Sequence, residues 1–150
     1  MNFLSKKEIE VSKNFNKHGY VVFDIEQKKE LNFIKNYIIE LSKKKLKIKK
    51  FDLNYLHKNL SKKQINDFRM YIFKNINNQK WLGIKYYKIF KTYLDIIVGN
   101  ELAMQNQINL SIQMPKDKSS VLPMHADTFN GESPFEVVAW LPLVNCYLNK

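Results

Sequence analysis

The period of the hydrophobic pattern changes at about Gly99, and this change restricts the possible folds more than any other feature. Before it, apolar side chains recur every three or four residues, which predicts amphipathic helices. After it, apolar and polar side chains alternate, which predicts strands. A chain of 150 residues that is 45% hydrophobic suits one domain with one core. We therefore expect a single α+β domain over residues 1–150, with about 1–99 mainly helical and about 103–150 made of strands.

The first part of the chain carries helix signals and one early strand. Ser5 and Glu8 have the spacing of a capping box, and Gly19 is expected to end this first helix near Lys17. The segment "YVVFDI" (20–25) predicts a short buried strand. Further helical segments are expected at about 27–41, from Ser61 to Ile76 and at about 79–98. Their buried faces are predicted to consist of Leu31, Ile34, Ile38 and Leu41, then Ile65, Phe68, Ile72 and Ile76, then Trp81, Ile84, Tyr87, Phe90, Leu94 and Ile97.

Two segments after Gly99 carry the strand prediction. In "AMQNQINLSIQMP" (103–115), one face is apolar and the other is polar but carries no lysine. Because the chain is rich in lysine, this face could line a polar cavity, although a plain exposed face is the alternative. The segment "FEVVAWLPLVN" (135–145) is apolar on both faces, which predicts a strand inside a sandwich. The polar face consists of Gln107, Asn109, Ser111 and Gln113.

The net charge is +11, and almost all of the positive charge comes from lysine. Arg69 is the only arginine, whereas proteins that read nucleic-acid sequence favour the bidentate guanidinium group. We therefore expect a solvated basic surface and no nucleic-acid partner. The densest run, "SKKKLKIKK" (42–50), is expected to end a helix and enter a loop, and a contact with anionic substrates is the alternative.

Other features bear on the cellular compartment. Cys146 is the only cysteine, which excludes an intrachain disulfide and suits a reducing compartment. The first ten residues lack the apolar core of a signal peptide, and no apolar run reaches the ~20 residues that span a bilayer. We expect a cytoplasmic protein with no membrane partner.

The stretch "LPMHADTFNG" (122–131) contains the strongest candidate site. Side chains at i and i+2 of a strand lie on one face, so His125 and Asp127 are expected side by side, with Ala126 on the other face. An imidazole and a carboxylate make up two-thirds of the facial triad that holds non-haem Fe(II). The alternative is structural, with Asp127 capping the following turn and His125 half-buried.

The segment "QINLSIQMPKDKSSVLPMHADTFNGESPFEVVAWLPLVNC" (107–146) resembles the phytanoyl-CoA dioxygenase-like Fe(II)/2-oxoglutarate oxygenases. In particular it resembles the branch from bacterial surface-carbohydrate gene clusters, the sporadic carbohydrate cluster 2OG-Fe(II) oxygenases. The resemblance is specific over about 105–146, and "GYVVFDI" before a helix is similar to how these enzymes begin. It implies helices packed on the first strands of a double-stranded β-helix, a jelly-roll or cupin-like barrel that is incomplete here.

The resemblance also implies an activity and roles for individual residues. The enzyme would use Fe(II), 2-oxoglutarate and O2 to oxidise a small molecule, such as a sugar or a polysaccharide precursor. His125 and Asp127 match the first two iron ligands. The polar residues Gln107, Asn109, Ser111 and Gln113 would face the barrel interior and contact 2-oxoglutarate or substrate, and Ser119, Ser120 and Trp140 would contact substrate, with turn and packing roles as the alternatives.

Part of the family pattern is missing. The family places a second histidine and a basic residue, usually arginine, after the motif, whereas His18, His57 and Arg69 all precede it. We therefore expect an N-terminal portion of an oxygenase, whose activity as an isolated chain is uncertain. The alternative is a non-catalytic interaction module that binds a partner through its open sheet edge or its basic helices, or that self-associates through that edge. A third interpretation, a basic nucleic-acid binder, predicts binding with a steep salt dependence.

Overall fold

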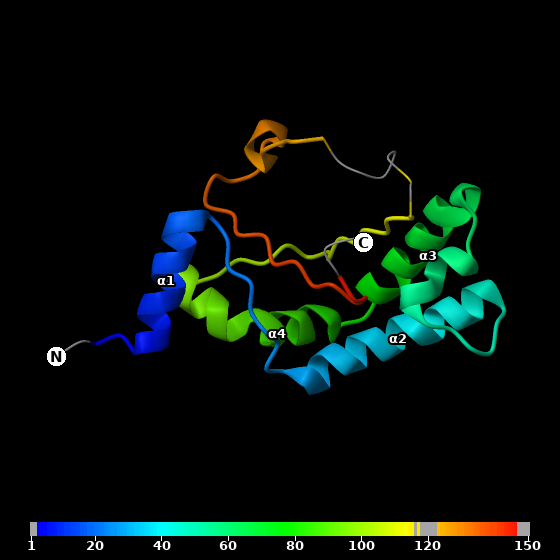
Figure 1. The fold of residues 1–150 in the computed structure, drawn as a ribbon, viewed down its shortest axis with the longest axis horizontal. Helices are drawn as coiled ribbons and strands as arrows, with labels where there is room; N and C mark the ends of the chain where they lie inside the picture. Colours follow the sequence, from blue (N-terminus) through cyan, green and yellow to red (C-terminus); the bar gives the residue numbers. More distant parts are fainter. Residues whose placement is uncertain (1–2, 116, 118–122, 147–150) are drawn as a thin grey trace. The chain divides into compact units, whose positions relative to one another are not determined.

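The computed structural model describes residues 3–115, 117 and 123–146, and helices are its only regular elements over that part of the chain (Figure 1). All four predicted helical segments are confirmed, with small shifts at their ends. The six-residue helix η1 was not expected from the sequence. The α-helices are α1 (Lys6–His18), α2 (Lys28–Leu46), α3 (Ile65–Asn77) and α4 (Leu82–Ile97), and the 3-10 helices are η1 (Leu53–Lys58), η2 (Lys62–Gln64) and η4 (Asp127–Asn130).

The prediction of a double-stranded β-helix is wrong, because no strand or sheet is present among the described residues. The segments 20–25, 103–115 and 135–145 lie outside regular structure. A helix forms its backbone hydrogen bonds within one segment, whereas a strand needs a second strand in register. Alternating polarity therefore predicts on which side of the backbone each side chain lies. It does not supply the neighbouring strand that a sheet requires.

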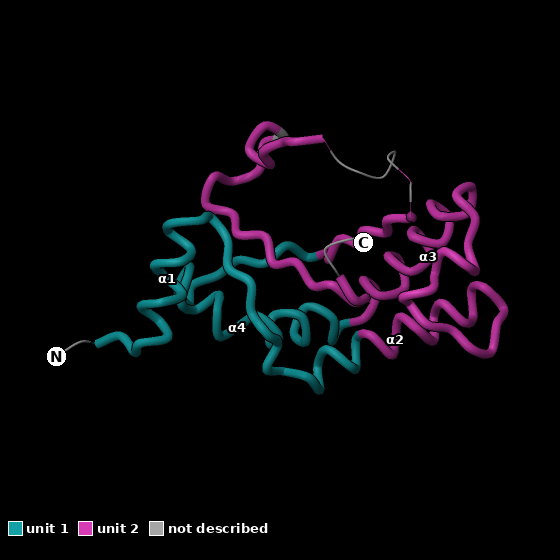
Figure 2. The backbone as a smooth tube through the Cα atoms, viewed as in Figure 1, with its two compact units in different colours: residues 1–34, 80–106 teal, residues 35–79, 107–150 magenta. Residues whose placement is uncertain are grey.

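The chain divides into two compact units (Figure 2). Unit 1 consists of residues 1–34 and 80–106, and unit 2 consists of residues 35–79 and 107–150. Helix α2 contributes its first turns to unit 1 and its remainder to unit 2.

Helix α1 in unit 1 begins and ends as the sequence predicts, within one residue. The Ser5 hydroxyl accepts from the Glu8 N–H (3.2 Å), and the Glu8 carboxylate accepts from the Ser5 N–H (2.6 Å), so the capping box is confirmed. These bonds hold the pKa of Glu8 below its usual value. Gly19 adopts a left-handed conformation (φ 76°), and its N–H donates to the Phe15 carbonyl (2.8 Å). Glycine reaches this conformation without steric cost, so it ends the helix.

The core of unit 1 forms where α1 packs against α4. Phe23 stacks on Tyr93 with ring centroids 3.5 Å apart, and it meets Phe90 edge-on at 6.0 Å. The segment 20–25 is therefore held by an aromatic side chain rather than by strand pairing. The buried apolar residues of this unit are Val11, Ile34, Leu82, Ile89 and Phe90.

The core of unit 2 is centred on α3. Phe68, Ile72 and Ile76 are buried, as the helical period predicts, and Ile72 has no exposed surface. Ser42 is the one buried polar residue among those described, and its hydroxyl donates to the Ile38 carbonyl one turn earlier (2.7 Å). This bond satisfies the hydroxyl group inside the core. The remaining buried apolar residues of this unit are Ile38 and Leu60.

Two asparagine side chains attach the non-helical segments of unit 2 to its helical part. The Asn77 amide accepts from the Ile108 N–H (2.8 Å) and donates to the Ile108 carbonyl (3.1 Å). The Asn54 amide oxygen accepts from the Asn145 N–H (2.9 Å). A side-chain amide carries one donor and one acceptor group, as a peptide does, so Asn77 satisfies Ile108 in place of a neighbouring strand.

No helix in the described part of the chain is long and apolar enough to cross a membrane.

Candidate functional site

The structure brings His125 and Asp127 together, as the i,i+2 spacing predicts. Ala126 between them is extended (φ −117°, ψ 134°), so the two side chains leave the backbone on the same side. The His125 Nε2 atom lies 3.4 Å from the Asp127 Oδ1 atom. Both side chains are about half exposed, at 42% and 47%, so the pair is accessible to a ligand.

The other ring nitrogen of His125 faces a backbone carbonyl group. Its Nδ1 atom lies 2.7 Å from the Pro123 carbonyl oxygen, which can only accept a hydrogen bond. Nδ1 therefore carries a proton, and in the neutral ring Nε2 presents a lone pair toward the carboxylate of Asp127. A proton on Nε2 would make this an imidazolium–carboxylate pair, and a metal ion could instead bind both atoms, which lie 3.4 Å apart.

The turn that follows Ala126 is the 3-10 helix η4. Helix η4 has Ala126 at its N-cap position, and no side-chain hydrogen bond caps it. The turn is closed by the main chain, where the Gly131 N–H donates to the Thr128 carbonyl (3.2 Å) and Gly131 is left-handed (φ 88°). Within the described residues, the contact shown for the Asp127 carboxylate is the one with His125.

The spacing of the pair fits two ligands of one divalent metal ion. Bonds from such ions to imidazole nitrogen and carboxylate oxygen are about 2.0–2.2 Å long, so two ligands at right angles lie about 3 Å apart. The hydrogen bond from Nδ1 to a backbone carbonyl is the outer contact that metal-binding histidines commonly make. Within residues 3–115, 117 and 123–146, no three His, Cys, Asp or Glu side chains gather as a metal-binding group. The pair would supply two ligands of a metal ion, and the described residues bring no third one to it.

The residues expected to contact 2-oxoglutarate lie on an exposed face. Gln107, Asn109 and Gln113 are exposed, whereas Ile108 and Leu110 between them are half-buried. The barrel interior that they were expected to line is not formed among the described residues. Their role toward 2-oxoglutarate stays a prediction.

Among the described residues, no contact is found between Trp140, which was expected to contact substrate, and the His125–Asp127 pair. Trp140 is 68% exposed and lies in the segment 135–145, which was predicted to be buried on both faces. Burial in this segment alternates instead, with Val137, Ala139, Leu141 and Leu143 half-buried. Ser119 and Ser120 lie outside the described residues.

A second feature, a hollow lined by lysine side chains, was only partly visible in the sequence. The run 42–50 indicates dense positive charge, but it does not indicate concavity. The chain turns back at the end of α2, and an open hollow of ≈ 500 Å³ forms beside the helix. Its lining residues are Glu40, Lys43, Lys44, Lys47, Ile48 and Lys49.

Comparisons of the chain with models of protein families, with curated proteins and with solved structures give no match.

Proposed function

We propose that His125 and Asp127 are two ligands of a ferrous centre, and that the protein acts as an Fe(II)- and 2-oxoglutarate-dependent oxygenase. The observation that supports the proposal is the 3.4 Å approach of Nε2 to Oδ1, with Nδ1 already committed to the Pro123 carbonyl. This arrangement leaves one imidazole lone pair and one carboxylate oxygen close enough to bind one metal ion. The resemblance of 105–146 to the oxygenases named above supplies the identity of the metal and of the co-substrate.

The residues have separate tasks in this proposal. His125 and Asp127 hold the metal and leave its other coordination positions to 2-oxoglutarate, O2 and the remaining protein ligand. The iron supplies the oxidising chemistry, and the chain supplies position. Gln107, Asn109 and Gln113 are the proposed contacts of 2-oxoglutarate. The proposed substrate is a small molecule such as a sugar or a polysaccharide precursor, contacted by Ser120 and Trp140. The third ligand and the basic residue that grips 2-oxoglutarate would come from outside the described residues.

Metal binding is the first test, and Mn(II) is the probe because it accepts imidazole and carboxylate ligands and broadens nearby NMR signals. In the full chain, Mn(II) should broaden the amide signals of residues 123–131. His125→Ala and Asp127→Asn should each weaken binding by about 100-fold or more, because they remove a ligand directly. His57→Ala is the matched control, since His57 lies on η1 in the same unit, and it should leave the affinity unchanged.

Two outcomes would contradict the metal assignment. One is broadening that persists unchanged in His125→Ala. The other is no broadening at 123–131 in the wild type, which would leave the imidazolium–carboxylate pair as the explanation of the geometry. If Mn(II) binds as proposed, oxygenase activity is tested by succinate release from 2-oxoglutarate with Fe(II). Succinate release that is equal in the wild type and in Asp127→Asn would contradict the catalytic role.

A second candidate function is a non-catalytic interaction module that self-associates through 135–145. The observation that favours it is an uncharged stretch from 137 to 145 that leaves Val138, Trp140 and Val144 exposed. In a chain of net charge +11, such a stretch is where two copies can approach without repulsion between lysines. Sedimentation equilibrium should then show a concentration-dependent dimer that Trp140→Lys weakens. A monomer at all concentrations would contradict this function.

A further inference from the structure

We propose that the hollow beside the end of α2 binds a small phosphate-bearing molecule through Lys44, Lys47 and Lys49. The hollow belongs entirely to unit 2. Its volume of ≈ 500 Å³ falls within the range of small-molecule sites, which is about 300–1,000 Å³. This inference does not depend on the proposed metal centre, because none of the hollow's lining residues belongs to that centre.

The hollow forms because the chain reverses direction at Lys47. This residue has φ 56°, the only positive φ of a non-glycine residue in the part of the chain that the structure describes. The Ile48 N–H donates to the Lys43 carbonyl (3.1 Å), which closes the end of the helix. A left-handed lysine costs about 1–2 kcal/mol relative to a right-handed one, so a glycine would be the ordinary choice here. The turn brings Ile48 and Lys49 beside the last turns of α2, where Glu40, Lys43 and Lys44 lie.

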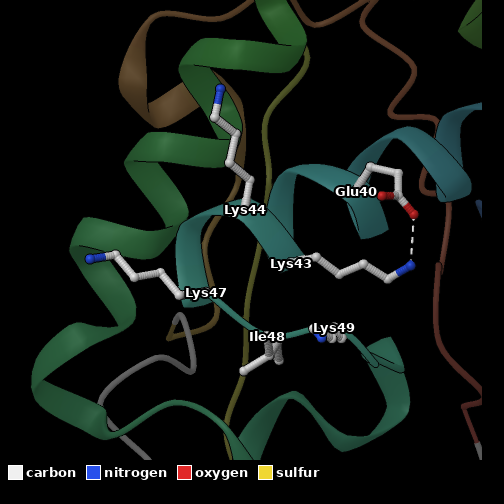
Figure 3. Close-up of a pocket in the computed structure, with 6 residues that line it drawn as sticks. All are labelled: Glu40, Lys43, Lys44, Lys47, Ile48 and Lys49. Atoms are coloured by element: carbon white, nitrogen blue, oxygen red, sulfur yellow. Dashed lines mark hydrogen bonds and ion pairs between the residues drawn. The ribbon is translucent and has the colours of Figure 1, made fainter.

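The charges of the hollow are only partly neutralised by the protein. Lys43 pairs with Glu40 (2.7 Å), and Lys45, just outside the hollow, pairs with Asp67 (2.7 Å) and lies over the Tyr71 ring. Lys44, Lys47 and Lys49 make no ion pair within residues 3–115, 117 and 123–146. Figure 3 shows Lys44 and Lys47 extending away from the Glu40–Lys43 pair. The three lysines line the open hollow, and their side chains point in different directions in Figure 3, so their flexible stems must move for the ammonium groups to meet on an anion.

The helix dipole accounts for only some of these lysines. Cations near the last turn of a helix are stabilised by its carbonyl groups, which explains Lys43, Lys44 and Lys45. Lys47 directly follows the last residue of α2, so the same carbonyl groups stabilise it, whereas Lys49 lies further along the chain. Lysine acts as a point charge for phosphate, without the fork that arginine uses for nucleic-acid bases. The basic side chains that line the hollow are all lysine, which suits the compact charge of a small phosphate-bearing ligand.

The test uses pyrophosphate as the probe and the full chain, with backbone amide shifts of residues 43–49 as the readout at low salt. Lys44→Gln, Lys47→Gln and Lys49→Gln together should weaken binding by about tenfold or more, because each removes a charge from the site. The matched control is Lys6→Gln, Lys13→Gln and Lys17→Gln on α1, which changes the net charge equally. It should weaken binding by less than about twofold, because those charges act from a distance and are screened.

Glu40→Gln separates a binding role from a structural one. Removing this carboxylate releases Lys43 and removes a repelling charge, so pyrophosphate should bind about two- to fivefold more tightly. Equal weakening by the two lysine triples would overturn the proposal, because binding would then follow net charge alone. Absence of shifts at 43–49 in the wild type would also overturn it. A single-stranded oligonucleotide that binds there with a steep salt dependence while pyrophosphate does not would replace the proposed ligand with nucleic acid.

Discussion

Helix α3 and the segment 135–145 belong to the same unit, and both were expected to be buried elements with an apolar face. Helix α3 forms, and its predicted residues Phe68, Ile72 and Ile76 are buried. The segment 135–145 does not form a strand and leaves Trp140 68% exposed. The difference shows what a hydrophobic period can predict. A period of 3.6 is sufficient for a helix because its hydrogen bonds are local, whereas a period of two requires a partner elsewhere in the chain.

The largest expected effect comes from the helical side of this comparison. Ile72→Ala removes a side chain with no exposed surface from the centre of α3 and should lower the free energy of unfolding by about 3–4 kcal/mol. Met70→Ala is the control on the same helix, because Met70 is 51% exposed, and it should cost less than about 1 kcal/mol. Urea unfolding followed by circular dichroism measures both. Equal costs would mean that α3 is not the centre of a packed core.

A second prediction contrasts α4 with the segment 20–25 of the same unit. Burial raises the pKa of Tyr86 on α4 to about 12, whereas Tyr20 in the extended segment is 65% exposed. In the unfolded chain this phenol ionises near pH 10. The folded state therefore keeps its full stability below pH 10 and loses stability, relative to the unfolded chain, as the pH rises to about 12. A shift of this size corresponds to about 3 kcal/mol.

Unfolding measured between pH 8 and pH 11 tests this difference. The wild type should lose stability as the pH rises above 10, and Tyr86→Phe should lose less because its ring cannot ionise. Tyr20→Phe should follow the wild-type curve. If Tyr86→Phe also followed the wild-type curve, the buried position of Tyr86 would be wrong.

The candidate site shows the same division between local and distant information. The approach of His125 and Asp127 depends on one extended residue between them, so the sequence predicts it correctly. A third metal ligand depends on how distant segments come together, which no local pattern encodes. The lysine run 42–50 was visible, but the hollow depends on the left-handed turn at Lys47, a position that a sequence rule assigns to glycine.

A third prediction concerns Asn77, which joins the two kinds of structure. Asn77→Ala removes both hydrogen bonds to Ile108 and should cost about 1–2 kcal/mol, because a part-buried N–H and carbonyl lose their partners. Asn75→Ala is the matched control, since its amide donates only to the Tyr71 carbonyl within α3. Hydrogen exchange of the Ile108 amide should speed up in Asn77→Ala and stay unchanged in Asn75→Ala. Unchanged exchange in both variants would mean that Asn77 does not hold this segment.

The smallest expected effect lies at Trp140, and it tests the corrected prediction most directly. Because Trp140 is 68% exposed, Trp140→Ala should change the free energy of unfolding by no more than about 0.5 kcal/mol. Truncating a tryptophan in a strand buried on both faces would lower the free energy of unfolding by about 3–5 kcal/mol. The cost of Trp140→Ala therefore distinguishes an exposed Trp140 from a buried one. Acrylamide quenching gives an independent measurement, because Trp81 is half-buried against the edge of Phe33. Trp140→Phe should therefore remove the more strongly quenched component of the fluorescence. A large loss of stability together with weak quenching would show that 135–145 is covered after all, and would restore the buried strand that the sequence pattern predicts.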